Sequence, residues 1–147
     1  MKHPPLPLNL YIQDFDTAAN RAGNVVVTYG ASQACKWLPL MITFSLTCGI
    51  VVADRFPYLE IYSGLTLKGR YAAILPQTAV STVQWSFIVD AEAMFSLTGA
   101  NGVVNLSSMN FLQGNETIQF GVLNGDAGDD ITNIRIRVGL AQQPYNI

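Results

Sequence analysis

The sequence predicts an all-β fold in which two antiparallel sheets pack as a jelly-roll-like sandwich, preceded by an extended N-terminal arm. Three observations predict this fold. Apolar and polar residues alternate in several short runs, turn-forming residues separate these runs at sandwich-like intervals, and no segment of useful length has helical periodicity. A jelly roll is favoured over an immunoglobulin-like order because no strand carries the buried cysteine and tryptophan pattern of the latter.

The chain is long enough for one core only. With 147 residues, a second independent core would leave each half with too little apolar surface to bury. The expected organisation is therefore an extended arm over residues 1–22 and a β-sandwich domain over residues 23–147.

The first twelve residues, MKHPPLPLNLYI, predict the arm. Each proline fixes its own φ and keeps the preceding residue out of the helical region. Residues 14–22 have some helical character, enough for a single turn. Because alternate side chains of an extended chain share one side, the arm is expected to lie along its own domain or a neighbouring subunit, through Leu6, Leu8, Leu10 and Ile12.

Strand patterns fill the first half of the domain. A β-branched run covers residues 25–29, and a short strand is expected over residues 65–68 between two glycines. Residues 55–62 also alternate, and Pro57 favours an edge position because an edge strand misses no ladder donor there. The clearest alternation covers residues 35–48. It places Leu38, Leu40, Ile42, Phe44, Leu46 and Cys48 on one face and Met41, Thr43, Ser45 and Thr47 on the other.

The second half repeats the pattern. Residues 82–89 predict a strand with one buried face, residues 90–97 a helical turn, and residues 103–106 a short strand. The last two strands are expected to form a hairpin around the acidic turn NGDAGDD. The expected core residues of this hairpin are Ile118, Phe120, Val122, Ile134, Ile136, Val138 and Leu140.

Charged residues are scarce throughout the chain. They make up 12% of it, against about 25% in an average soluble domain, and the net charge is −2. This balance gives no electrostatic reason to bind nucleic acid or an anionic membrane. Charge is missing from both faces of several strands, including the face of Thr43 and Ser45. We therefore expect much of this surface to be covered by protein partners.

The N-terminal residues do not read as a secretory signal, since prolines interrupt the segment directly after Lys2 and His3. Residues 37–53 carry no charge, but their alternating hydroxyls and Pro39 argue against a membrane span. Cys35 and Cys48 bracket a strand that would hold them about 40 Å apart, too far for a disulfide. Free buried thiols in a reducing cytosol are expected.

The residue inventory argues against an enzyme. The only histidine is His3, so serine or cysteine nucleophiles lack a base, and the histidine-rich metal site of cupin-like jelly rolls lacks its ligands. No cofactor is expected. A paired-carboxylate glycosidase using Asp90 with Glu92, or Glu60 with Glu116, stays formally open. Ordinary turn and solvated strand positions are the favoured interpretation of these acids.

The turn over residues 124–130 concentrates oxygen ligands that could hold Ca²⁺, namely Asp126, Asp129 and Asp130. Its spacing does not match a twelve-residue calcium loop, because no glutamate follows at the twelfth position. Aspartate and glycine are also the residues that any tight turn recruits, so a plain turn is favoured over a metal site.

Two further pairs are candidate contact residues. Tyr58 and Tyr62 share one face of their strand and could stack on a sugar ring, although a subunit interface is favoured for them. Arg135 and Arg137 alternate with core isoleucines and so point outward together, toward acids of a neighbour or toward solvent.

Two segments carry a family resemblance. Residues 36–47, KWLPLMITFSLT, and residues 126–138, DAGDDITNIRIRV, resemble the first and last framework strands of a loose group of small tailed-bacteriophage virion proteins. The resemblance covers about a quarter of the chain and has no catalytic content. It implies a jelly-roll-like structural subunit present in many copies, as a capsid decoration, head-fibre or tail-associated protein.

The sequence thus leads to one leading expectation and one alternative. The leading expectation is a non-enzymatic virion protein, assembled in the host cytoplasm, homo-oligomeric as a trimer, and bound through its arm to other virion proteins such as the major capsid protein. The alternative is a carbohydrate-binding β-sandwich module that uses the surface aromatics Tyr58 and Tyr62.

Overall fold

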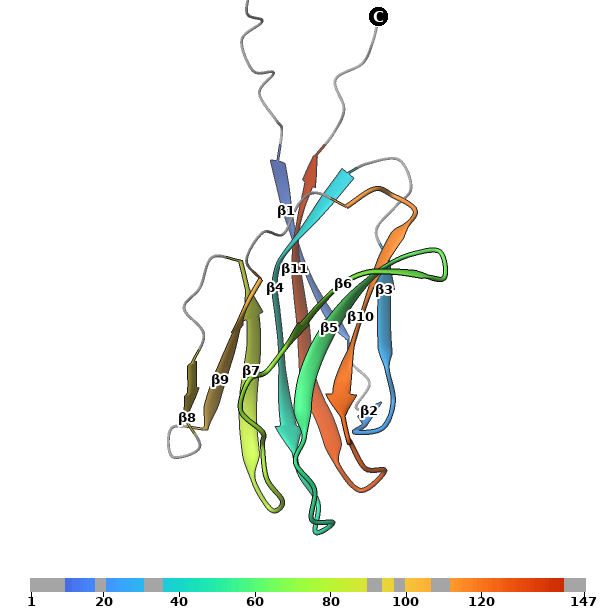
Figure 1. Cartoon of the computed structure of the whole chain (residues 1–147). Coiled ribbons are helices and arrows are strands. Elements are labelled where there is room, and N and C mark those ends of the chain that lie inside the picture. Colours follow the sequence, from blue (N-terminus) through green and yellow to red (C-terminus); the bar gives the residue numbers. More distant parts are fainter. Residues whose placement is uncertain are drawn as a thin grey trace, which may run out of the picture.

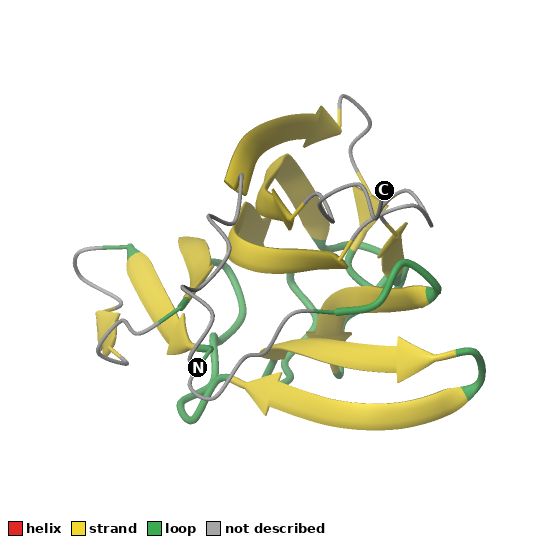
Figure 2. Cartoon of the chain, turned by 90° about the horizontal axis from the view of Figure 1, so that it is seen from above, coloured by secondary structure: helices red, strands yellow, loops and turns green. Residues whose placement is uncertain are grey.

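The regular structure of the computed structural model consists of β-strands. It describes residues 10–17, 21–30, 36–89, 94–96, 100–106 and 112–141, and no helix occurs among them. Figure 2 shows the described elements as strands, loops and turns, with no helix among them. The described strands are β1 (Leu10–Thr17), β2 (Arg21–Ala22), β3 (Val27–Gly30), β4 (Lys36–Thr47), β5 (Phe56–Ser63), β6 (Thr66–Ala72), β7 (Thr82–Ile88), β8 (Met94–Ser96), β9 (Asn101–Asn105), β10 (Glu116–Leu123) and β11 (Asp130–Ala141).

Two sheets form the sandwich (Figure 1). The larger, sheet A, has the order β1-β11-β4-β7-β9-β8, with β2 also paired to β11. The smaller, sheet B, has the order β3-β10-β5-β6. All pairs are antiparallel except β7 with β9, which run parallel.

The strand order is that of a jelly roll. When β2 and the inserted pair β8–β9 are set aside, eight strands remain. In chain order they pair first with last (β1–β11), second with seventh (β3–β10), third with sixth (β4–β7) and fourth with fifth (β5–β6). This nested pairing distributes the strands over two sheets, as in a double Greek key. The predicted fold class is confirmed.

Aromatic side chains fill the space between the sheets. Phe44 of β4 stacks on Phe87 of the same sheet and on Phe120 of the opposite sheet, with ring centroids 6.1 and 5.8 Å apart. Trp37 and Trp85 are also fully buried, and Gly102 of β9 leaves the room that the Trp85 ring occupies. Offset aromatic packing of this kind adds to the free energy that area burial supplies.

Two β-bulges shift the predicted alternation. Opposite β11, the register passes from Met41 directly to Pro39, so Leu40 is the extra residue of a bulge. As a result Trp37 and Pro39 face the core with Ile42, whereas Leu38 and Leu40 are only half-buried. Their predicted core positions are therefore wrong, because a bulge reverses the two-residue alternation.

The second bulge lies in β11, where Asn133 has a φ of 53°. Residues Ile131 and Ile134 are consequently both buried, although three positions separate them. Beyond this bulge the prediction is confirmed, since Ile134, Ile136 and Val138 are buried and alternate with exposed Arg135 and Arg137.

Two local predictions are also wrong. Strand β5 lies between β10 and β6 and is not an edge. Pro57 is accommodated because it stands at the start of the strand, where its carbonyl accepts a hydrogen bond from the amide of Ala73. Of the two predicted helical turns, residues 14–17 belong to β1 and residues 94–96 to β8, since pairing to neighbouring strands overrides weak local propensity.

Part of the predicted arm, residues 10–17 and 21–22, belongs to sheet A. Strand β1 pairs with β11 along its whole length, from Leu10 opposite Ala141 to Thr17 opposite Ile134, and β2 pairs with the start of β11. Leu10 and Ile12 thus belong to sheet A, because unpaired β11 would expose a full row of backbone donors and acceptors. Leu6 and Leu8 lie outside the described residues.

Candidate functional site

A buried ion pair lies at one end of the sandwich. Arg55, just before β5, donates from Nε to Oδ2 of Asp129 at 2.7 Å and from Nη2 to Oδ1 at 3.0 Å. Both side chains have no exposed surface. Their fork-to-fork geometry is the arrangement in which an arginine and a carboxylate bind most strongly.

Each oxygen of the Asp129 carboxylate also accepts a second hydrogen bond, from a backbone amide. Oδ1 of Asp129 accepts a hydrogen bond from the amide of Gly49, and Oδ2 accepts one from the amide of Asp126, at 2.7 and 2.9 Å. The guanidinium of Arg55 donates to the carbonyls of Ala53 and Val51. A buried pair is tolerated when its hydrogen bonds are satisfied in this way.

The protonation of Asp129 follows from these contacts. Burial by itself would raise the pKa of the Asp129 carboxyl, but the hydrogen bonds from Arg55 and from the backbone of Asp126 and Gly49 outweigh burial. The pKa therefore lies below its ordinary value, and Asp129 is ionised at neutral pH.

A second buried network, centred on Gln77, joins the loop over residues 73–81 to the loop that contains Arg55. The side-chain amide of Gln77 donates to the carbonyls of Leu46 and Ser81 and accepts from the indole nitrogen of Trp85 at 2.8 Å. Its backbone exchanges two hydrogen bonds with Arg55. The loops over residues 48–55 and 73–81 are thus held together from inside the sandwich.

The turns that contain Gly23 and Asn124 are hydrogen-bonded to the same group of loops. The backbone carbonyl of Asp129 accepts from the amide of Gly23, and Asn124 donates to the carbonyl of Asp54. We call residues 23–26, 48–55, 73–81 and 123–129 together the loop end. It is the lower end of the molecule in Figure 1, where β4 turns into β5, β6 into β7 and β10 into β11.

The outside of the loop end is apolar. Ile50 is 86% exposed and Val52 90%, although both belong to residue types that normally avoid water. Among the described residues, every exposed large hydrophobic side chain except Leu65 and Leu67 lies here. The set is Val25, Val26, Ile50, Val51, Val52, Ile74, Leu75, Val80 and Leu123.

The charges near these side chains are mostly acidic. Asp54 is exposed and Asp126 half-buried, and Asp130 is exposed where β11 begins. The one basic residue within the loop end, Arg55, is buried in its ion pair. The loop end therefore presents aliphatic side chains with acids among them.

The outer face of sheet B carries a second cluster. Leu59 and Ile61 of β5 point into the core, so Tyr58, Glu60 and Tyr62 lie on the opposite face. Glu60 is only 6% exposed. Its Oε2 accepts hydrogen bonds from the Tyr62 hydroxyl at 3.0 Å and from Arg70 of β6 at 3.3 Å.

Arg70 also covers Tyr58, with its guanidinium carbon 5.8 Å from the ring centroid. Tyr58 extends over Gly121 of β10, where an added Cβ would lie 3.1 Å from the Tyr58 hydroxyl oxygen. The hydrogen bond to Glu60, burial and the charge of Glu60 raise the pKa of Tyr62, while burial and the charge of Glu60 raise that of Tyr58. Both phenols are therefore protonated at neutral pH.

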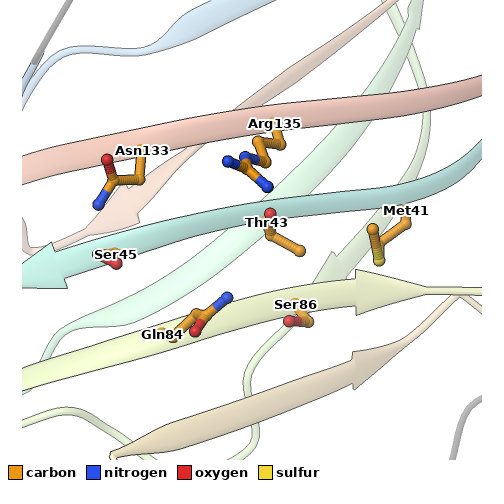
Figure 3. A pocket seen from close by; sticks show the side chains of 7 residues that line it. All are labelled: Met41, Thr43, Ser45, Gln84, Ser86, Asn133 and Arg135. Carbon is orange, nitrogen blue, oxygen red and sulfur yellow. The ribbon is translucent and has the colours of Figure 1, made fainter. Parts of the chain in front are cut away.

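The outer face of sheet A is hollowed between β11, β4 and β7 (Figure 3). This open depression of about 530 Å³ is floored by small side chains such as Thr43, Ser45 and Ser86. Its one charged lining residue is Arg135. The described residues that line it include neither an acid nor a histidine. The remaining lining residues are Met41, Gln84 and Asn133.

The acidic turn has a different role from the one considered for calcium. Asp129 is occupied by Arg55 and two amides, Asp126 caps the amide of Gly128 through Oδ2, and Asp130 is the first residue of β11. Among the described residues, no group of three histidine, cysteine or acidic side chains could hold a metal ion. The turn is the Asx-bonded turn that its composition favours.

The other predicted residues are spread over the molecule. Glu60 and Glu116 have separate hydrogen-bond partners: Glu116 accepts from the amide of Gln113, and Glu60 accepts from Tyr62 and Arg70. Asp90 and Glu92 lie outside the described residues. Cys48 is a free, buried thiol, as expected, and burial raises its pKa.

Sequence reasoning missed the residues at the centre of the loop end. Arg55 and Gln77 carry no local pattern that announces burial, and Asp129 lies 74 positions from its partner. The one available signal was an arginine at the end of a long uncharged stretch in a chain poor in charge.

Comparison with known proteins adds no relative. No protein-family model matches the chain, and neither a curated protein nor a solved structure matches it. No helix among the described residues is long and apolar enough to cross a membrane.

Proposed function

We propose that this chain is a non-enzymatic structural component of a bacteriophage particle, bound to other particle proteins through its loop end. The observation that carries the proposal is the set of exposed aliphatic side chains on loops that a buried ion pair holds in place. Clustered exposed apolar side chains on a soluble domain are typical of an interaction site. The phage setting rests on the sequence resemblance of β4 and the β10–β11 turn.

Fixed loops favour tight binding. Ordering a flexible loop on association costs free energy, and the contacts of Arg55, Gln77 and Asp129 order these loops beforehand. Full burial of one exposed valine, leucine or isoleucine supplies about 1.5–3 kcal/mol. A few of these side chains, led by Ile50 and Val52, are enough to hold a subunit on a shell.

The partner is best matched by an apolar protein surface with basic residues at its rim. Asp54, Asp126 and Asp130 would be repelled by an anionic membrane and attracted by lysines or arginines. The major capsid protein is the partner that the sequence resemblance implies. Self-association as a trimer is part of the same proposal, since the outer face of sheet A carries few charges around its depression.

In this proposal, residues 1–9 also contribute to binding of the particle. Residues 10–17 are needed for sheet A, so an arm deletion must stop at residue 9. We expect the variant lacking residues 1–9 to keep its fold and to bind particles less tightly than the full chain, measured by cosedimentation. Unchanged cosedimentation would show that residues 1–9 do not contribute to binding, and binding would then be assigned to the loop end alone.

The loop end is tested by paired variants. Ile50→Ser with Val52→Ser changes the loop end, and Leu65→Ser with Leu67→Ser changes exposed aliphatic residues on the β5–β6 hairpin. Quantitative mass spectrometry of purified particles would count the copies incorporated. We expect the first variant to be depleted about tenfold or more and the second to match the wild type. Equal incorporation of both variants would contradict the proposal.

A further inference from the structure

The cluster on the outer face of sheet B has the features of a ligand site that assembly through the loop end does not use. It lies on the face of β5 and of the edge strand β6, while the loop end lies beyond the ends of these strands. The described strands form two layers, and none of them covers this face.

The carboxylate of Glu60 has one oxygen that its neighbours in the cluster do not use. The side chain is almost entirely buried, yet one oxygen serves both Tyr62 and Arg70, and the contact with Arg70 is 3.3 Å long. The other oxygen, Oε1, accepts no hydrogen bond from a described residue. Arg70 is itself 56% exposed, and partly exposed ion pairs contribute little to stability.

The neighbouring groups are held in fixed positions. Gly121 makes room for Tyr58, whose ring lies under the guanidinium of Arg70, and the hydroxyl of Tyr62 is directed to Glu60. Because Tyr58 and Tyr62 are four residues apart on a strand, the site extends over about 13 Å. This length exceeds a single sugar ring.

These groups select a class of ligand. The ring of Tyr62 can accept the apolar face of a sugar, Oε1 of Glu60 can accept a hydrogen bond from a hydroxyl, and the exposed nitrogens of Arg70 can donate to one. The Tyr58 ring, covered by the Arg70 guanidinium, supports that guanidinium from below. The charges of Glu60 and Arg70 cancel within the site, so a charged ligand gains no net attraction. We propose that Tyr58, Glu60, Tyr62 and Arg70 form a binding site for a neutral oligosaccharide.

A glycan array that carries neutral and acidic oligosaccharides, incubated with the full chain, tests this site. We expect binding to neutral glycans of more than one sugar unit, weakened about tenfold or more by Tyr62→Ala and by Glu60→Gln. Tyr62→Phe keeps the ring and should bind more tightly than Tyr62→Ala. Lys68→Ala, on the same strand as Arg70, is the matched control and should bind as the wild type does.

Several results would overturn the proposal. An array without binding, binding of acidic glycans only, or equal binding by the wild type and Tyr62→Ala would each do so. Thermal unfolding of each variant verifies that it is folded, and the nearly isosteric Glu60→Gln covers the case in which Tyr62→Ala unfolds. Incorporation into particles should be the same in all of these variants, so failure of the glycan site is distinct from failure of the loop end.

Discussion

Arg55 and Asp129 are the residues that hold the segments of the loop end together. Both are fully buried, and between them they hydrogen-bond to the backbone of all four loop-end segments. A buried pair of this kind contributes less than its Coulomb energy, because both ions lose their hydration. Its importance is that neither partner can be removed alone.

Loss of one partner should be costly. Asp129→Asn leaves the Arg55 guanidinium buried without a counter-charge, so we expect a loss of about 3–5 kcal/mol in the free energy of unfolding. Urea denaturation measures it. The comparison variant is Arg70→Met, which breaks the partly exposed pair with Glu60 and should cost at most about 1 kcal/mol. Similar costs for the two variants would contradict the role given to Arg55 and Asp129.

The same pair predicts how stability depends on pH. The folded-state pKa of Asp129 is lowered, so its contribution is complete above the unfolded pKa of about 3.9 and is lost as pH falls through the folded pKa. The stability difference between the wild type and Asp129→Asn should therefore be constant near neutral pH and shrink on acidification. Chemical denaturation from pH 7 downward measures it, and a difference that is independent of pH would exclude ionised Asp129 as its source.

At the scale of elements, the turn between β10 and β11 depends on close backbone contact. A Cβ at Gly125 would overlap the backbone carbonyl of Gly23, and a backbone atom cannot move aside as a flexible side chain can. This contact joins the turn to the β2–β3 segment within the loop end.

Gly125→Ala should therefore loosen the turn. We expect it to destabilise the fold by about 1–3 kcal/mol, as overpacking does. Gly69→Ala is the matched control, because a Cβ there meets open space, and its effect should stay within about 0.5 kcal/mol. Thermal unfolding compares the stabilities of the two variants. Equal losses of stability would contradict the prediction, because they would show that the backbone near Gly23 and Gly125 accommodates a Cβ without a loss of stability.

The strands could be predicted from sequence because alternation is a local property. It located β4, β5, β7, β10 and β11, and it placed Arg135 and Arg137 on the outside. It failed where a bulge inserted one residue, at Leu40, because the pattern itself does not show where pairing slips.

The loop end could not be predicted for a related reason. Its centre depends on residues that are distant in the chain, such as Arg55 and Asp129, and on which loops meet at one end of the sandwich. That meeting follows from the jelly-roll strand order, which alternation alone does not determine. The tyrosine pair of β5 was visible from spacing, but Arg70 and Gly121 join it only through pairing with β6 and β10.

On the scale of the whole molecule, the functions proposed for the two surfaces are independent. The loop end is apolar and lies at one end of the sandwich, whereas the cluster on the outer face of sheet B is polar and aromatic. The scarcity of charge in the sequence is explained in part by the loop end, where aliphatic side chains occupy exposed positions. A particle protein bound through its loop end would keep the face of Tyr58 and Tyr62 open to solvent.

The central claim is that the loop end contacts another particle protein. Photo-crosslinking tests it directly, with a photoreactive amino acid placed at position 52 and, separately, at position 65 on the β5–β6 hairpin. Irradiation of purified particles, followed by mass spectrometry, should join position 52 to another virion protein and leave position 65 without that product. Crosslinks from position 65 alone, or none from position 52 in particles that contain the chain, would contradict the claim.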